Sequence, residues 1–99
     1  MIHIRQAALD DLDALAPLFD GYRQFYRQPT DIAAGRAFLA ARLGQRESVI
    51  LLAAMADRPA GFCQLYPIFS SVSMRRAWLL NDLFVDPNAR GHGVGEALL

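Results

Sequence analysis

The first half of the chain contains two different hydrophobic periods. Residues 2–6 alternate between apolar and polar side chains, which predicts a short strand. Apolar side chains then recur every three or four residues, the spacing of one face of an amphipathic helix; they are Ala8, Leu12, Leu15, Phe19, Tyr22 and Tyr26. Pro17 lies within this pattern and has no backbone N–H, so we expect a kink or a restart of the helix there.

A second helix is predicted directly after the first. Thr30 can cap a helix with its hydroxyl, and the pattern continues from there through Leu43. Gly44 is placed to end this helix, since glycine commonly follows the last helical turn. Phe38 and Leu39 are its expected anchors in the core.

The pattern of apolar runs and turns in the second half predicts a β-meander. Residues 48–55 form a nearly continuous apolar run, typical of a strand buried on both faces. A turn at residues 57–59 leads into a returning strand over 60–69, and the polar residues 70–75 connect it to a third strand over 76–85. A glycine-rich loop and the beginning of another helix follow.

These elements predict an α/β fold with an α+β mixed sheet. Their order is strand, helix, helix, three strands and helix, and helices that precede a meander imply a sheet covered on at least one face. No repeat, low-complexity tract or linker divides the chain, so residues 1–99 are predicted to belong to a single domain.

Composition narrows the function classes. The chain has ten basic and ten acidic residues, which gives no basic excess for binding nucleic acid. It contains no apolar run of about 18 residues that would cross a membrane and no signal-peptide pattern at its start. Cys63 is the single cysteine, so no intrachain disulfide can form. We expect a cytoplasmic protein without nucleic-acid or membrane partners.

The glycine-rich loop that follows the last strand predicts a phosphate-binding site. It consists of Arg90, Gly91, His92, Gly93, Val94 and Gly95. Glycines leave backbone N–H groups accessible, and the first turn of a helix adds unpaired N–H groups. A dinucleotide-binding fingerprint would need a glycine where Glu96 stands, and a Walker loop would need Gly-Lys-Ser/Thr, which the chain lacks. A merely flexible connection between strand and helix is the other alternative.

This arrangement resembles the acetyl-CoA signature of the GCN5-related N-acetyltransferases (GNAT superfamily). The family loop reads Arg/Gln-x-x-Gly-x-Gly/Ala, and Arg90, Gly93 and Gly95 match it. The resemblance extends over essentially all 99 residues but covers only the N-terminal part of the family fold. It implies an incomplete domain, truncated after the acetyl-CoA loop, of an enzyme that transfers an acetyl group from acetyl-CoA to a primary amine in a ternary complex.

The resemblance also implies which residues bind the cofactor. The segment Leu83-Phe84-Val85 would pair with the pantetheine arm like an added strand, and a local bulge would aim a backbone N–H at the thioester oxygen. Leu83 and Val85 would also pack in the core. The backbone N–H groups of the glycine-rich loop would surround the pyrophosphate, with the Arg90 side chain nearby.

Asp82 is the candidate catalytic residue. Many family members carry a carboxylate just before the Leu-aromatic-Val segment, and Asp82 occupies that place. The resemblance implies that it accepts the proton of the amine, directly or through water, or contacts the amine. The alternative is a solvated carboxylate, or one paired with Arg75 or Arg76.

Other reactive residues have weaker cases. The family's general acid is commonly a tyrosine in a later helix, and none of the tyrosines present lies at that position; they are Tyr22, Tyr26 and Tyr66. Tyr22 and Tyr26 fit the packing stripe, although they could line an acceptor pocket. Cys63 is expected to be a buried apolar residue. His3 and His92 are isolated, so no metal site is predicted.

The acceptor is expected to be a small-molecule or peptide amine. Segments 64–67, 70–76 and 81–85 resemble the Hpa2-like branch of the superfamily, which acetylates small polyamines and basic protein substrates. Trp78 is expected in the core or in a dimer contact. A non-catalytic module that binds CoA or assembles with a partner is the alternative function, because an unfinished sheet leaves an unpaired edge that favours a homodimer.

Overall fold

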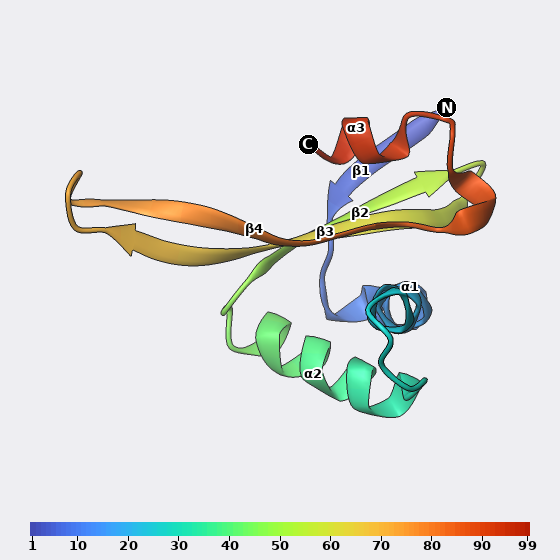
Figure 1. Cartoon of the computed structure of the whole chain (residues 1–99), viewed down its shortest axis with the longest axis horizontal. Coiled ribbons are helices and arrows are strands. Elements are labelled where there is room, and N and C mark those ends of the chain that lie inside the picture. The colour runs from blue at the N-terminus through green and yellow to red at the C-terminus, as the bar shows by residue number, and fades with distance from the viewer.

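The structure, a computed structural model, describes all 99 residues as a four-stranded sheet with helices on both faces (Figure 1). The strands pair antiparallel in the order β1 (Ile2–Gln6), β2 (Val49–Met55), β3 (Arg58–Ser70), β4 (Arg75–Val85). Helices α1 (Leu12–Phe25) and α2 (Ile32–Gly44) cover one face, and the short α3 (Val94–Leu98) lies over the other. The predicted order of elements and the α/β class are confirmed.

The core has two parts because the middle of the sheet is buried on both faces. The larger part lies between the sheet and α1 and α2; its most deeply buried members are Leu15, Leu39, Ile50, Leu52 and Phe62. The smaller part lies beneath α3; its members are Ala53, Ala60, Cys63, Ala89, Val94 and Leu98. Since β2 supplies residues to both, the prediction of a strand buried on both faces is confirmed.

Helix α1 follows the predicted apolar stripe only in part. Its first three turns bury Leu12, Leu15 and Phe19, whereas Tyr26 is 60% exposed because the helix has ended at Phe25. Pro17 causes no restart, and one helix continues through it. A 3₁₀ turn (Leu9–Asp11) precedes α1.

The boundaries of α2 differ from the prediction at both ends. Asp31, rather than Thr30, is the N-cap, and its carboxylate accepts a hydrogen bond from the Ala34 N–H at 3.1 Å. Thr30 is unavailable as a cap because its hydroxyl donates to the Asp20 carboxylate at 2.6 Å. Gly44 is the last helical residue rather than the residue that follows.

The anchors of α2 behave differently from each other. Leu39 is 1% exposed, which confirms it as a core residue. Phe38 is 40% exposed, although its ring stacks on that of Phe19 with 5.8 Å between centroids.

The two hairpins of the meander also differ from the pattern. The first turn is made by Ala56 and Asp57, both with positive φ, rather than by residues 57–59, and Pro59 already pairs with Ala54 inside the sheet. The second hairpin extends well beyond the helices as a two-stranded arm (Figure 1). Trp78 lies on this arm and is 49% exposed, so it is not a core residue.

Two bulges alter the register of β3 with its neighbours. Ala60 is an extra residue opposite β2, and Asn81 is an extra residue of β4, lying between the pairs Gln64–Asp82 and Leu65–Leu80. The bulge that we expected within Leu83–Val85 is therefore at Asn81. An extra residue changes the face toward which the neighbouring side chains point. From Asp82 onward, alternate side chains of β4 face α1.

Asp20 fixes the connection between the two helices. Its buried carboxylate accepts hydrogen bonds from the Thr30 hydroxyl, the Asp31 N–H and the Gln24 amide. The Thr30 hydroxyl and then the Asp31 N–H lower the pKa of Asp20 below its ordinary value of 3.8. Because its pKa is lower when the protein is folded, the ionised carboxylate stabilises the fold above pH 3.8, and this stabilisation is lost as the pH falls further.

We expect Asp20→Asn to lower the free energy of unfolding at neutral pH by about 1.5–3 kcal/mol, since it removes charge-assisted hydrogen bonds. The difference from wild type should shrink as the pH falls below 3.8, where the wild-type carboxyl also loses its charge. Denaturant unfolding at several pH values measures both effects. Asp10→Asn is the matched control, because Asp10 is exposed and accepts no hydrogen bond. A difference that persists unchanged into acid would contradict this account.

Candidate functional site

The outer edge of β4 is open. β4 is the last strand of the sheet, so one side of its backbone has no neighbouring strand. The Asp86 N–H donates to the Ala60 carbonyl at 2.8 Å, which fixes the alternation of the backbone groups. In an antiparallel ladder, the backbone N–H and C=O groups of Phe84 then point toward β3, while those of Leu83 and Val85 point outward. An extended ligand could pair with these groups as an added strand does.

The glycine-rich loop lies at the end of this edge and presents unpaired donors. The backbone N–H groups from Arg90 to Glu96 donate to no protein acceptor; the first N–H beyond them, that of Ala97, bonds the Gly93 carbonyl at 3.0 Å. Consecutive free N–H groups in a turn that leads into a helix are suited to binding an anion.

Backbone conformation explains why two positions of the loop are glycine. Gly91 and Gly93 both have φ of +84°, and Gly93 is the N-cap of α3. This left-handed conformation is strained for residues with a Cβ atom. No other atom lies within 4 Å of the positions that Cβ atoms would occupy there, so the space around both glycines is open to a ligand. His92, between them, is exposed.

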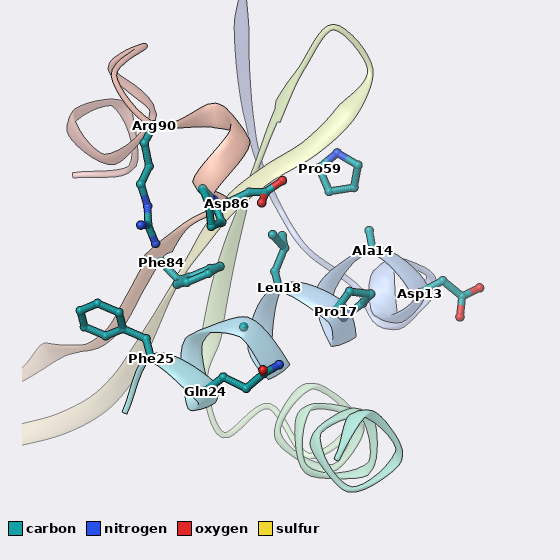
Figure 2. A pocket seen from close by; sticks show the side chains of 12 residues that line it. Asp13, Ala14, Pro17, Leu18, Gln24, Phe25, Pro59, Phe84, Asp86 and Arg90 are labelled. Atoms are coloured by element: carbon teal, nitrogen blue, oxygen red, sulfur yellow. The ribbon is translucent and has the colours of Figure 1, made fainter. Parts of the chain in front are cut away.

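Two adjoining hollows lie between α1 and the junction of β4 with the loop. The larger, of about 620 Å³, is shown in Figure 2. The smaller, of about 430 Å³, follows the open edge and is lined by Tyr22, Tyr26 and the segment Leu83–Val85. Both are also lined by Phe25, Phe84 and Arg90. The surface between helix and strand edge is therefore concave, and its smaller hollow is largely aromatic.

Arg90 connects the loop to the strand edge. Its side chain runs back toward Phe84 (Figure 2), with the guanidinium carbon 5.7 Å from the centre of that ring. Its Nε donates to the Val85 carbonyl at 3.1 Å, which is one of the outward groups of the edge. The positive charge thus lies at the strand edge, beside the hollows.

Asp82 lies behind this surface rather than on it. Its side chain is 3% exposed and lines neither hollow. One carboxylate oxygen accepts from the Asn81 amide at 2.7 Å and the other from the Gln64 amide at 2.5 Å. No arginine forms an ion pair with it, so the alternative that pairs Asp82 with Arg75 or Arg76 is wrong.

Tyr22 lies between Asp82 and the smaller hollow. Its hydroxyl donates to the carbonyl of Asn81 at 3.3 Å, and its ring lines the hollow. Burial raises the pKa of Tyr22, and the charge of Asp82 raises it further. Burial and then Asp82 also raise the pKa of Tyr66. Both phenols stay protonated at neutral pH and can donate hydrogen bonds near the carboxylate.

The comparisons with known proteins agree with this architecture. A sequence profile described as "Acetyltransferase (GNAT) family" matches residues 13–99. The chain is 56% identical over 98 residues to the "Uncharacterized N-acetyltransferase YhfO" of Bacillus subtilis, which covers 99% of this chain and 66% of that protein. The chain belongs to the GNAT family of acetyltransferases.

Solved structures support the same family membership. The crystal structure of a "probable acetyltransferase" superposes with a TM-score of 0.90 at 52% identity and covers 97% of this chain and 65% of that one. A "predicted acetyltransferase with acetyl-CoA" from Clostridium acetobutylicum shares the fold at 16% identity, with a TM-score of 0.74, and covers 99% of this chain and 68% of that one. The chain thus spans about two thirds of these relatives, aligned with the N-terminal part of the GNAT fold.

Within the GNAT fold, one expectation near the site is wrong and another is borne out. Leu83 is 38% exposed at the open edge and is not a core residue, whereas Val85 packs partly against the smaller part of the core. Tyr22 contacts the core, as its packing stripe predicts, and it also lines the smaller hollow, which is the alternative that the sequence left open.

No group of three or more His, Cys, Asp and Glu side chains is arranged to hold a metal ion. None of the helices has the length and hydropathy needed to cross a membrane.

Cys63 is buried beneath α3 and is 1% exposed. Burial raises the pKa of its thiol, which keeps it in the unreactive protonated form. We expect Cys63 to react with a thiol reagent at least about a hundredfold more slowly in the folded protein than in denaturant, because reaction requires opening of the fold. Absorbance of the released chromophore measures both rates. Fast labelling of the folded protein would contradict the burial of this cysteine.

Proposed function

We propose that this chain provides the acetyl-CoA-binding part of an N-acetyltransferase that acts on a primary amine. The observation that carries the proposal is the row of unpaired N–H groups from Arg90 to Glu96, placed at the end of the open edge of β4. A diphosphate fits the first feature and an extended pantetheine arm fits the second. The relative from Clostridium acetobutylicum, whose crystal structure is described as being with acetyl-CoA, has the same fold.

In this proposal each part of the site holds one part of acetyl-CoA. Loop residues Arg90 to Gly95 bind the pyrophosphate through their backbone N–H groups. The outward groups of Leu83 and Val85 pair with the pantetheine amides. The Arg90 side chain donates a hydrogen bond to the Val85 carbonyl, which the pantetheine arm would also use. In this proposal the Arg90 side chain moves away when the arm pairs with Val85 and then lies near the phosphates.

The proposed transfer is a direct attack in a ternary complex. The nitrogen of the neutral amine attacks the thioester carbonyl carbon, the C–S bond breaks, and the sulfur leaves as the thiolate of CoA. A cationic acceptor first gives one proton to the Asp82 carboxylate and so becomes the neutral amine, and the proton that the nitrogen loses after the attack is taken up by the departing CoA thiolate. Because Asp82 is 3% exposed, we propose that the proton reaches it through a water or past the Tyr22 hydroxyl, which faces the hollow.

The acceptor is proposed to be a small-molecule or peptide amine. Asp82 supplies a negative charge close to the aromatic hollow, which favours a cationic amine before it loses its proton. Membership of the Hpa2-like branch, suggested by segments 64–67, 70–76 and 81–85, is the finer form of this proposal. A module that binds CoA without transfer remains the second candidate, because the chain spans only part of its relatives.

Binding can be tested by a ¹H–¹⁵N correlation NMR titration of the protein with acetyl-CoA. We expect selective shifts of the amide signals from Leu83 to Glu96. Gly93→Val should weaken binding about tenfold or more, since a branched side chain strains a residue with φ of +84° and fills the open space beside the loop. Gly44→Ala, at an exposed helix end with open space around it, is the control. Unchanged affinity of Gly93→Val would exclude the loop as the cofactor site.

Transfer can be tested with Asp82→Asn, assayed as the whole protein with acetyl-CoA and a series of amines. We expect kcat to fall about 10²–10⁴-fold, the range for loss of a general base, with little change in KM for acetyl-CoA. Raising the pH should recover part of the rate, because more of the amine is then neutral without the base. Wild-type binding of acetyl-CoA without transfer to any amine would favour the module instead.

A further inference from the structure

A buried line of polar side chains runs from Asp82 through β3 to the start of β2. Gln64 is 0% exposed, and its amide donates to Asp82 at 2.5 Å. Ser48, directly before β2, is 8% exposed, and its hydroxyl donates to the Gln64 carbonyl oxygen at 2.8 Å. These three side chains form the only buried polar chain that crosses strands in this sheet.

The line has a fixed direction. An ionised carboxylate can only accept hydrogen bonds, so Gln64 must turn its NH₂ group toward Asp82. Its carbonyl oxygen then faces Ser48 and needs a donor, which only the Ser48 hydroxyl provides. If the Gln64 amide turned over, an oxygen would face the carboxylate and an NH₂ group would face the hydroxyl. The carboxylate thus sets the orientation of Gln64, and the Ser48 hydroxyl supplies the hydrogen bond that the buried Gln64 oxygen would otherwise lack.

The Gln64–Asp82 pair lies where an apolar pair of side chains would cost less free energy to bury. The neighbouring cross-strand pair on the same face is Phe62–Phe84, which belongs to the core. A buried carboxylate costs several kcal/mol unless it is hydrogen-bonded, and an apolar replacement is often neutral or stabilising. A polar pair with its own buried support therefore suggests a role other than stability.

Gln64 and Asn81 are the two side chains that donate hydrogen bonds to the Asp82 carboxylate. From α1 the titratable group that faces it is Tyr22, and from β3 it is Tyr66; both are neutral phenols. Against the larger effect of burial, the charge of Arg42, on α2, lowers the pKa of Tyr66, but the ion pair of Arg42 is with Glu47 and not with Asp82. Asn81 is exposed and lies in the bulge. Gln64 is the one buried donor that touches the carboxylate.

We propose that Ser48 and Gln64 are positioning residues, which hold the Asp82 carboxylate in one fixed orientation for the proton transfer. The inference rests on the proposed role of Asp82. It extends the site to a residue at the start of β2 that contacts neither acetyl-CoA nor amine. Ser48→Ala should leave the buried oxygen of Gln64 without a donor and so loosen this side chain, and Gln64→Leu should remove the buried donor to Asp82 itself.

The arrangement can be measured without any activity. In the wild type we expect the side-chain NH₂ signals of Gln64 in a ¹H–¹⁵N spectrum to exchange slowly with water, because this amide is buried and hydrogen-bonded at both ends. Ser48→Ala should abolish the slow exchange, and Ser48→Thr, which keeps the hydroxyl, should preserve it. Ser71→Ala is the matched control, because Ser71 is exposed on the hairpin turn. Slow exchange that survives in Ser48→Ala would overturn the proposed role of Ser48 in holding Gln64.

Turnover of the whole protein tests the consequence. We expect Ser48→Ala to lower kcat about tenfold to a hundredfold, the scale of a misplaced catalytic group, while the Kd for acetyl-CoA stays unchanged. Ser48→Thr should restore most of the rate, whereas Gln64→Leu should match or exceed the loss. An unchanged kcat in Ser48→Ala and Gln64→Leu would overturn the positioning role alone. Loss of acetyl-CoA binding by the wild type would instead overturn the proposed function.

Discussion

β4 pairs with a neighbouring strand, β3, along one edge only. The register between these two strands therefore determines which side chains of β4 enter the core and which of its backbone groups stay unpaired. The pair Phe62–Phe84 directs both aromatic rings into the core beneath α1, and the pair Gln64–Asp82 directs a carboxylate to the same face. Alternation then leaves Leu83 and Val85 with outward backbone groups. One ladder thus positions the buried acid and the open edge together.

Packing of α1 on this ladder closes the site from one side. A Cβ atom on Gly21 would lie 2.9 Å from the Phe84 ring, so the absence of a side chain lets the helix approach β4 closely. The next residue, Tyr22, can then reach the Asn81 carbonyl in the bulge. On the opposite face, Gly61 gives β3 a similarly close contact, since a Cβ atom there would lie 2.7 Å from the Phe84 carbonyl oxygen. Both close contacts thus pack against Phe84, two residues along β4 from Asp82.

The polar groups of the site divide into two kinds with different physical roles. Those around Asp82 are buried and bonded to one another, so their orientation is set before any ligand arrives, which is the arrangement that favours catalysis. Those from Arg90 to Glu96 are backbone donors without protein partners. Their unsatisfied capacity is available to an anion. The GNAT family membership gives both kinds a common interpretation, in which one end of the ligand is held and the other end reacts.

The sequence by itself determined the order of elements, the family and the glycine-rich loop, because hydrophobic period and glycine spacing are local properties of the chain. It also singled out Asp82 through its place before the Leu-aromatic-Val segment. It could not place the bulge at Asn81 or the N-cap at Asp31, since the first depends on register and the second on Asp20 claiming the Thr30 hydroxyl. The tertiary structure alone decided that Ser48 and Gln64 stand behind Asp82, because strand pairing brings together residues that are far apart in the sequence.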